Sequence, residues 1–255
     1  MTGFALNYLA LVARDTEAVC RFLGGSLGLM RTDLAIEGRA IPFFGIGDAA
    51  LGIFDPEDPY LDAPRAPGVH HMALGSIDPA QTAERHGFQI TQAGVGPVNK
   101  RFVAVAPNET CGIRTRFIEP LGIVGVGAKV ERIDHLGIAS TDNARCIEVF
   151  STNLGCAVES AQTDIELRQV TESFISDKYG AVYHARTPEI LGGLRGLFIS
   201  VGDCELEIMQ DYDSALAPRA RLGEAAGNTK GDQSAIARFV ARRGPGLAHL
   251  AFATP

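Results

Sequence analysis

Two stretches of the sequence match each other without a gap, and this match decides how the chain is organised. Residues 6–29 read LNYLALVARDTEAVCRFLGGSLGL, and residues 133–156 read IDHLGIASTDNARCIEVFSTNLGC. The offset is 127 throughout, so that Asp15 falls on Asp142. A match of this length at one fixed offset is typical of an internal repeat. We therefore expect the two halves of the chain to fold in the same way.

Further matches extend the repeat. The segment IGDAALGIFDPED, which starts at Ile46, matches VGDCELEIMQDYD, which starts at Val201, at an offset of 155. The second copy therefore carries 28 extra residues between its two matched stretches. Two shorter relatives of the opening stretch are HHMALGSID from His70 and AHLAFATP from Ala248. The chain thus has four such openings.

Each long copy predicts a strand, then a helix, then further strands. The opening residues alternate between apolar and small or polar side chains, which is typical of a strand. Asp15 and Asp142 then stand where a helix N-cap is expected, and Gly28 and Gly155 stand where the helix ends. Strand-like runs follow, IPFFGIG and ALGIFD in the first copy and GLFISVG and ELEIMQ in the second. Ahead of Ala248, the segment SAIARFVARRGPG predicts one more helix, ended by its Gly and Pro residues.

The composition is that of an ordinary globular protein. Hydrophobic residues make up 46% of the chain and charged residues 21%, which excludes a disordered chain. The net charge of -7 argues against nucleic acid or an anionic membrane as a partner, since both need clustered Lys and Arg. We find no signal peptide and no apolar run near the ~18 residues of a membrane span, so we expect a cytoplasmic protein. The five cysteines form no C-x2-C pair and predict free thiols.

The unit of strand, helix and three strands resembles the βαβββ module of the vicinal oxygen chelate superfamily, which includes glyoxalases, bleomycin-resistance proteins and dioxygenases. The resemblance implies an α+β fold in which tandem βαβββ modules form two glyoxalase-like domains, residues 4–122 and residues 130–255. The four modules would start near Ala5, Val69, Arg132 and Leu247. The fourth module is then incomplete, present only as its first strand. Either the chain is a fragment or another chain completes this module.

Three side chains are candidate metal ligands: His135, Glu207 and His249. Strand alternation places each of them opposite the large apolar residues of its own strand, and both histidines have glycine or alanine neighbours on that face. Two imidazoles and a carboxylate that converge form a ligand set for a divalent metal. The resemblance implies the same three ligands, with a fourth from the rest of module four. The ordinary alternative is a pair of hydrogen-bonded histidines on a solvated strand face.

The first half lacks a comparable ligand set. By the same alignment its positions are Tyr8, Gly52, His71 and Arg116. Tyrosine is a poor ligand for most such metals, glycine offers no ligand atom, and arginine is a cation without a free lone pair. We therefore expect residues 4–122 to bind no metal.

The leading functional hypothesis is a metal-dependent epimerase, isomerase or lyase, because the second half most resembles methylmalonyl-CoA epimerases. The resemblance implies that a divalent ion (Co, Mn, Ni, Zn or Fe) polarises a small carbonyl or acyl-CoA substrate and stabilises its enolate. Glu207 favours this hypothesis, as ligand and catalytic residue, because such enzymes have a carboxylate or amide ligand on that strand. The base that removes the proton stays open between Glu205 and Glu172.

Two other hypotheses remain. The first is a non-haem Fe(II) dioxygenase of the extradiol or 4-hydroxyphenylpyruvate type, whose metal-free first half resembles this one and whose carboxylate ligand would come from the end of module four. The second is a non-catalytic small-molecule-binding protein that needs no metal. The expected partner is a small molecule, with no nucleic acid and no membrane, and a homodimer stays open.

The extra residues of the second copy include the segment LRQVTESFISDKYGAVYHARTPEILGG. Tyr179, Tyr183, His184 and Arg186 are candidates there for lining a pocket, because long ordered segments near a site are often functional. Their spacing identifies no substrate.

Overall fold

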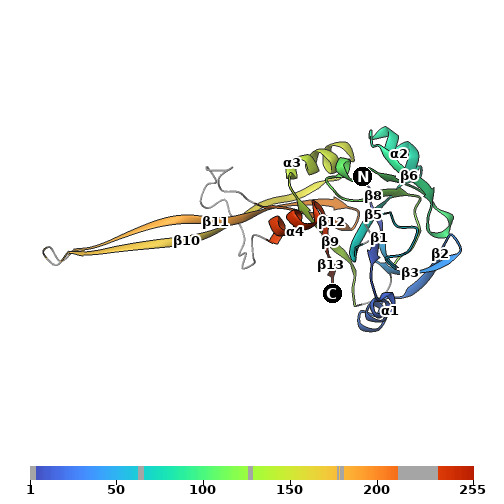
Figure 1. Cartoon of the computed structure of the whole chain (residues 1–255), viewed down its shortest axis with the longest axis horizontal. Coiled ribbons are helices and arrows are strands. Elements are labelled where there is room, and N and C mark those ends of the chain that lie inside the picture. Colours follow the sequence, from blue (N-terminus) through green and yellow to red (C-terminus); the bar gives the residue numbers. More distant parts are fainter. Residues whose placement is uncertain (1–3, 63–65, 126–128, 177, 179–180, 212–234) are drawn as a thin grey trace.

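The computed structural model describes residues 4–62, 66–125, 129–176, 178, 181–211 and 235–255, and it describes only the backbone of residues 165–176 and 181–192. Its strands form an eight-stranded sheet in the first half and a five-stranded sheet in the second (Figure 1). The fold is α+β, with few helices beside the two sheets. Among the described residues no helix combines the length and apolar character needed to cross a bilayer.

The first half contains two units of strand, helix and three strands. In chain order its elements are β1 (Leu6–Val12), α1 (Thr16–Arg21), η1 (Phe22–Ser26), β2 (Arg31–Ile36), β3 (Arg39–Ile46), β4 (Ala49–Phe54), β5 (Gly68–Gly75), α2 (Pro79–Arg85), β6 (Ile90–Val95), η2 (Pro97–Asn99), β7 (Arg101–Val105), η3 (Pro107–Thr110) and β8 (Thr115–Ile118). The strand order across the sheet is β2-β3-β4-β1-β5-β8-β7-β6.

The second half contains one such unit, followed by a helix and a single strand. Its elements are β9 (Arg132–Ser140), α3 (Asn143–Cys146), η4 (Ile147–Asn153), β10 (Val158–Ser176), β11 (Ala181–Val201), β12 (Cys204–Asp211), α4 (Ala235–Arg243) and β13 (Gly246–Ala253). The strand order is β10-β11-β12-β9-β13. The predicted helix before the last strand is thus α4.

The same three-stranded arrangement lies at the centre of both sheets. In the first half β1 is parallel to β4 and antiparallel to β5. In the second half β9 is parallel to β12 and antiparallel to β13. The helices that follow β1 and β9 also begin alike, since Asp15 accepts a hydrogen bond from the backbone N–H of Ala18, and Asp142 from that of Arg145. The internal repeat of the sequence is therefore a repeat of structure.

One hydrophobic core joins the two halves. It contains Leu9 and Phe117 from the first half and Leu136 and Leu206 from the second, all of them buried. The apolar residues that alternate with the candidate ligands on β9 and β12 therefore point into this core. The opposite face of the first sheet is filled by a second apolar cluster, which includes Tyr8.

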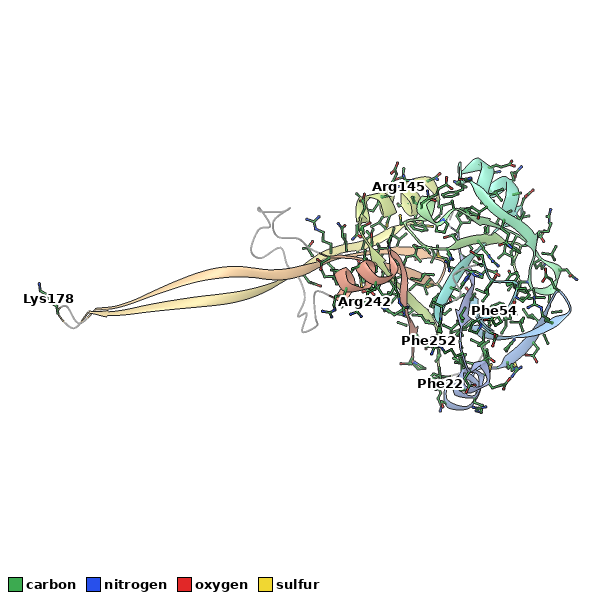
Figure 2. The ribbon with its side chains drawn as sticks, viewed as in Figure 1. Phe22, Phe54, Arg145, Lys178, Arg242 and Phe252 are labelled. Carbon is green, nitrogen blue, oxygen red and sulfur yellow. The ribbon has the colours of Figure 1, made fainter. Side chains whose placement is uncertain are left out.

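The extra residues of the second copy lengthen an existing pair of strands. β10 and β11 pair antiparallel up to Ser176 and Ala181, and this hairpin projects away from the rest of the protein (Figure 1). Lys178 marks its far end in Figure 2. The backbone of Tyr183, His184 and Arg186 belongs to β11 near that end, away from the body of the protein, whereas their side chains and Tyr179 lie outside the described residues. The prediction that these side chains line a pocket therefore falls outside the described residues.

Candidate metal centre

His135, Glu207 and His249 come together from three neighbouring strands, β9, β12 and β13. Each residue offers one ligand atom, and these atoms all lie within 4.8 Å of one another. Glu207 Oε2 lies 3.4 Å from Nε2 of His135 and 3.4 Å from Nε2 of His249. The two imidazole rings meet edge to face, with centroids 5.5 Å apart. The three side chains thus share one face of the second sheet.

The strand register explains why these side chains meet. Gly137 pairs with Glu207 across the parallel β9–β12 ladder and with His249 across the antiparallel β9–β13 ladder. Side chains that are register neighbours on one face lie within contact distance, and His135 stands two residues before Gly137 on that face. Gly137 itself leaves the space that the His249 ring occupies, because a β-carbon there would overlap the ring.

Asp134 orients the imidazole of His135. Its Oδ2 lies 3.1 Å from His135 Nδ1, and its Oδ1 lies 2.7 Å from a guanidinium nitrogen of Arg132. A neutral imidazole carries one proton, and a proton on Nδ1 donates to Asp134. Nε2 then keeps its lone pair and faces Glu207. Such a carboxylate partner is the usual support of a metal-binding histidine.

Electrostatics keep the Glu207 carboxylate ionised. A hydrogen bond with His249 lowers the pKa of Glu207 below its ordinary value, against the opposing effect of burial. Glu205, on the same face of β12, behaves in the opposite way. A hydrogen bond with Glu159, together with burial, raises the pKa of Glu205 to about 7. Two carboxylates on one strand face therefore differ in proton affinity, which is typical of paired acid and base groups.

The residues present fit a divalent cation. Bonds of about 2.1 Å at tetrahedral angles place neighbouring ligand atoms about 3.4 Å apart, and both nitrogen–oxygen distances here have that value. With its proton on Nδ1, His135 directs a lone pair at a negative oxygen, and a cation between the two satisfies both. The His249 side chain is 47% exposed, so the centre is open on that side.

The equivalent positions of the first half hold a buried polar network. The Tyr8 hydroxyl lies 2.9 Å from His71 Nε2 and 2.8 Å from the Tyr60 hydroxyl. Arg116 packs its guanidinium between the rings of Tyr60 and Phe102 and donates a hydrogen bond to the Tyr60 carbonyl. Burial keeps the pKa of His71 well below its ordinary value. The side chains of Tyr8, His71 and Tyr60 thus hydrogen-bond to one another where the second half presents candidate ligands.

Comparison with known proteins supports the fold and no more. No family model and no curated protein matches the sequence. The structure of a mutant 4-hydroxymandelate synthase from Streptomyces coelicolor is similar to this one, with a TM-score of 0.59 and 16% sequence identity. The matched region covers 99% of this chain and 71% of the synthase chain. This chain has a vicinal oxygen chelate fold. The structure of methylmalonyl-CoA epimerase from Mycobacterium tuberculosis matches over 46% of this chain and 87% of the epimerase chain, with 19% sequence identity and a TM-score of 0.39.

Within the vicinal oxygen chelate fold, the sequence patterns did not reveal which residues hydrogen-bond to His135 in the second half and to Tyr8, at the equivalent position, in the first half. Asp134 was not singled out, although its place beside His135 in the chain is a usable signal. Tyr60 has no such signal, because it reaches Tyr8 from a loop outside the repeat. Of the two candidate bases, Glu205 shares the face of Glu207, whereas the side chain of Glu172 lies outside the described residues.

Proposed function

We propose that this chain is a divalent-metal enzyme in which His135, Glu207 and His249 hold the ion. The observation that carries the proposal is the convergence of their three ligand atoms within 4.8 Å on one face of the sheet. The support of His135 by Asp134 and the space above Gly137 add to it. The proposed reaction is that of an epimerase, isomerase or lyase on a small carbonyl or acyl-CoA substrate.

The residues divide the work of such a reaction. The ion, when bound, supplies a Lewis acid that polarises the substrate carbonyl and favours its enolate. His135 and His249 would hold the ion through imidazole nitrogens, and Glu207 would hold it through its carboxylate. Glu205 lies on the same face and opposite His135 in the strand register, where it is the candidate to accept the α-proton of the substrate. Asp134 holds the His135 ring in place throughout.

Metal titration of the chelator-treated protein tests the ligand set. His135→Ala, Glu207→Gln and His249→Ala should each lower Co(II) affinity at least about 100-fold, because the loss of even an outer supporting partner costs about 10–100-fold. His86→Ala is the matched control, since His86 contacts Asn153 and stands outside the centre. Equal affinities in the three variants and the control would refute the assignment.

A dioxygenase is the second candidate, because non-haem Fe(II) oxygenases use two histidines and one carboxylate. His135 and His249 would supply the histidines, and the resemblance implies a carboxylate from the end of module four. The identity of the metal in the purified full-length protein separates the alternatives. Iron, with oxygen consumption on addition of an oxidisable substrate, would favour the dioxygenase. Cobalt, manganese, nickel or zinc would favour the epimerase, isomerase or lyase, and a metal-free protein would favour a binding function.

A further inference from the structure

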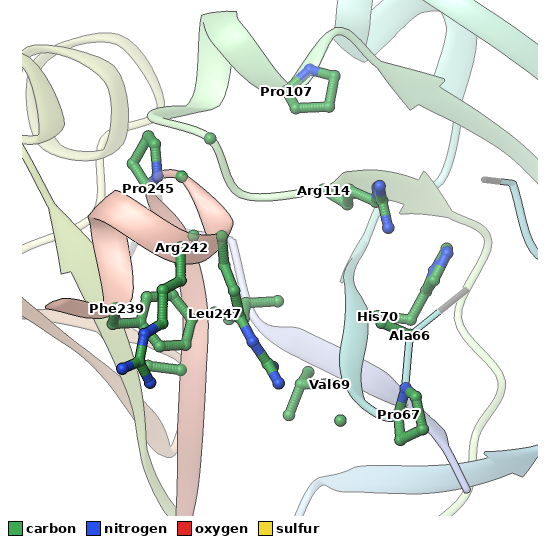
Figure 3. A pocket seen from close by; sticks show the side chains of 16 residues that line it. Ala66, Pro67, Val69, His70, Pro107, Arg114, Phe239, Arg242, Pro245 and Leu247 are labelled. Atoms are coloured by element: carbon green, nitrogen blue, oxygen red, sulfur yellow. The ribbon is translucent and has the colours of Figure 1, made fainter. Parts of the chain in front are cut away.

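A cavity of about 450 Å³ lies between the two halves of the protein. Its first wall is the start of β5 and the segment before β8, and its second wall is the end of α4 and the start of β13. Figure 3 shows His70 and Arg114 on one side and Phe239, Arg242 and Leu247 on the other. This volume lies within the range of about 300–1,000 Å³ that is typical of small-molecule pockets.

The charged side chains among the described residues that line this cavity are all arginines. Arg114 comes from the first half, and Arg242 and Arg243 come from the second. None of the described residues that line the cavity is an aspartate or a glutamate. Three guanidinium groups around one space raise the local potential and attract an anion, since arginine stays charged at every physiological pH.

The dipole of helix α4 explains the positions of only two of the three arginines. Arg242 and Arg243 are exposed in the last turn of α4, where basic residues are favoured by the helix dipole. That preference does not place Arg114 across the cavity from them. Asp62 partly balances Arg114, at 3.8 Å from its Nε, but Asp62 does not line the cavity. The Arg243 guanidinium lies 5.7 Å from the centre of the Phe239 ring.

His70 adds no charge to the cavity. Its Nε2 lies 2.7 Å from the Asp62 carbonyl oxygen, and its Nδ1 lies 2.9 Å from Nδ1 of His71, so both ring nitrogens have partners. Burial lowers the pKa of His70 to about 4, so the ring is neutral near pH 7. The positive potential of the cavity therefore comes from the arginines.

The cavity walls are fixed against each other by a close backbone contact. Gly112 has a φ of +82°, and a β-carbon on it would overlap the carbonyl oxygen of Pro245. Gly246 has a φ of +149°, and its own β-carbon would approach the carbonyl oxygen of Gly112. The absence of side chains at both positions lets the two halves meet beside the arginines.

We propose that this cavity binds a small phosphate-bearing anion through the guanidinium groups of Arg114, Arg242 and Arg243. Guanidinium forks match the oxygen spacing of phosphate and bind it bidentately. Three cations without a carboxylate in the lining suit a dianion better than a single carboxylate ligand. The site joins residues from both halves, and it does not require a metal at His135, Glu207 and His249.

Calorimetry on the chelator-treated full-length protein tests this proposal independently of the metal centre. Inorganic phosphate and glycerol phosphate distinguish a free anion from a phosphomonoester, and sodium chloride at matched ionic strength reports general salt effects. Arg242→Gln and Arg243→Gln should each weaken phosphate binding about tenfold or more, as expected for the loss of a hydrogen bond between charged groups. Arg114→Gln should do the same if it folds.

Arg85→Gln is the matched control, since it removes the same charge from an exposed helix position in α2, outside the cavity. The proposal expects no change in phosphate affinity for this variant. Three results would overturn it: no saturable phosphate binding below about 10 mM, an equal loss of affinity in Arg85→Gln, or tighter binding of succinate than of phosphate.

Discussion

Gly137 controls the space beside the candidate metal centre. It pairs with His249 across the β9–β13 ladder, and the imidazole ring of His249 lies directly over its α-carbon. Any β-carbon at this position would overlap three atoms of that ring. Gly137 adopts no positive φ in this structure, so space rather than backbone conformation requires glycine here.

Gly137→Ala should therefore displace His249 and lower Co(II) affinity about 10–100-fold, the usual cost of disturbing the support of a ligand. Titration calorimetry measures this loss, and circular dichroism should show an intact fold. Gly25→Ala is the control, because a β-carbon at Gly25 meets no atom within 4 Å. If Gly137→Ala binds Co(II) as tightly as the unmodified protein does, then His249 is not a ligand.

His70 makes stability depend on pH. Its side chain is 4% exposed, and burial lowers its pKa to about 4, with Arg114 and Arg116 acting in the same direction and Asp62 opposing them. In the unfolded chain a histidine has a pKa of about 6.5, so the unfolded state takes up a proton first as the pH falls. The folded state is thus favoured above pH 6.5, and this contribution is lost as the pH falls from about 6.5 to about 4.

The expected loss from His70 is on the order of 3 kcal/mol across that window, and His71, whose pKa burial also lowers, changes stability in the same direction. Urea unfolding at pH 7 and pH 4.5 measures the difference in free energy of unfolding. His70→Gln should reduce this difference. An unchanged pH dependence in that variant would mean that His70 has the same pKa in the folded and the unfolded protein.

At the scale of strands, one pairing pattern serves two different purposes. Tyr8 and Ala50 are partners between β1 and β4, just as His135 and Glu205 are partners between β9 and β12. His71 faces Ala10 in the first half as His249 faces Gly137 in the second. The first sheet uses these positions for a buried hydrogen-bond network, and the second presents candidate ligands there.

His71→Ala should leave the metal stoichiometry of the protein unchanged, because its Nε2 is engaged by the Tyr8 hydroxyl. His249→Ala, at the equivalent strand position, should abolish metal binding. Elemental analysis of both variants after reconstitution with Co(II) gives the comparison. A large loss of metal in His71→Ala would show that the metal is bound in the first half.

The sequence predicts the strand pattern well because the repeat and the alternation of apolar residues both depend on local order. It does not predict the length of β10 and β11, since the 28 extra residues have no counterpart in the first copy. It also does not bring Tyr60 to Tyr8 or Arg114 to Arg242. The Tyr60–Tyr8 contact depends on how a loop packs, and the position of Arg114 across the cavity from Arg242 depends on how the halves pack. Neither kind of packing leaves a period in the sequence.

The molecule as a whole depends on how its halves meet. Their hydrophobic core is shared, and polar contacts reinforce it at the edge, where Asp203 accepts a hydrogen bond from the backbone N–H of Asp48 and His86 lies 3.2 Å from Asn153. Gly112 of the first half lies against Pro245 of the second half. This approach also forms the wall of the cationic cavity.

Gly112→Ala should destabilise the protein more than Gly87→Ala does. The two glycines share a positive φ, +82° and +70°, so alanine costs similar backbone strain at both. Only at Gly112 would the new methyl group meet the other half, whereas a β-carbon at Gly87 meets no atom within 4 Å. Overpacking of this kind costs about 1–3 kcal/mol, which urea unfolding of the two variants resolves. Equal destabilisation in the two variants would mean that the contact between Gly112 and Pro245 can open without a loss of free energy of unfolding.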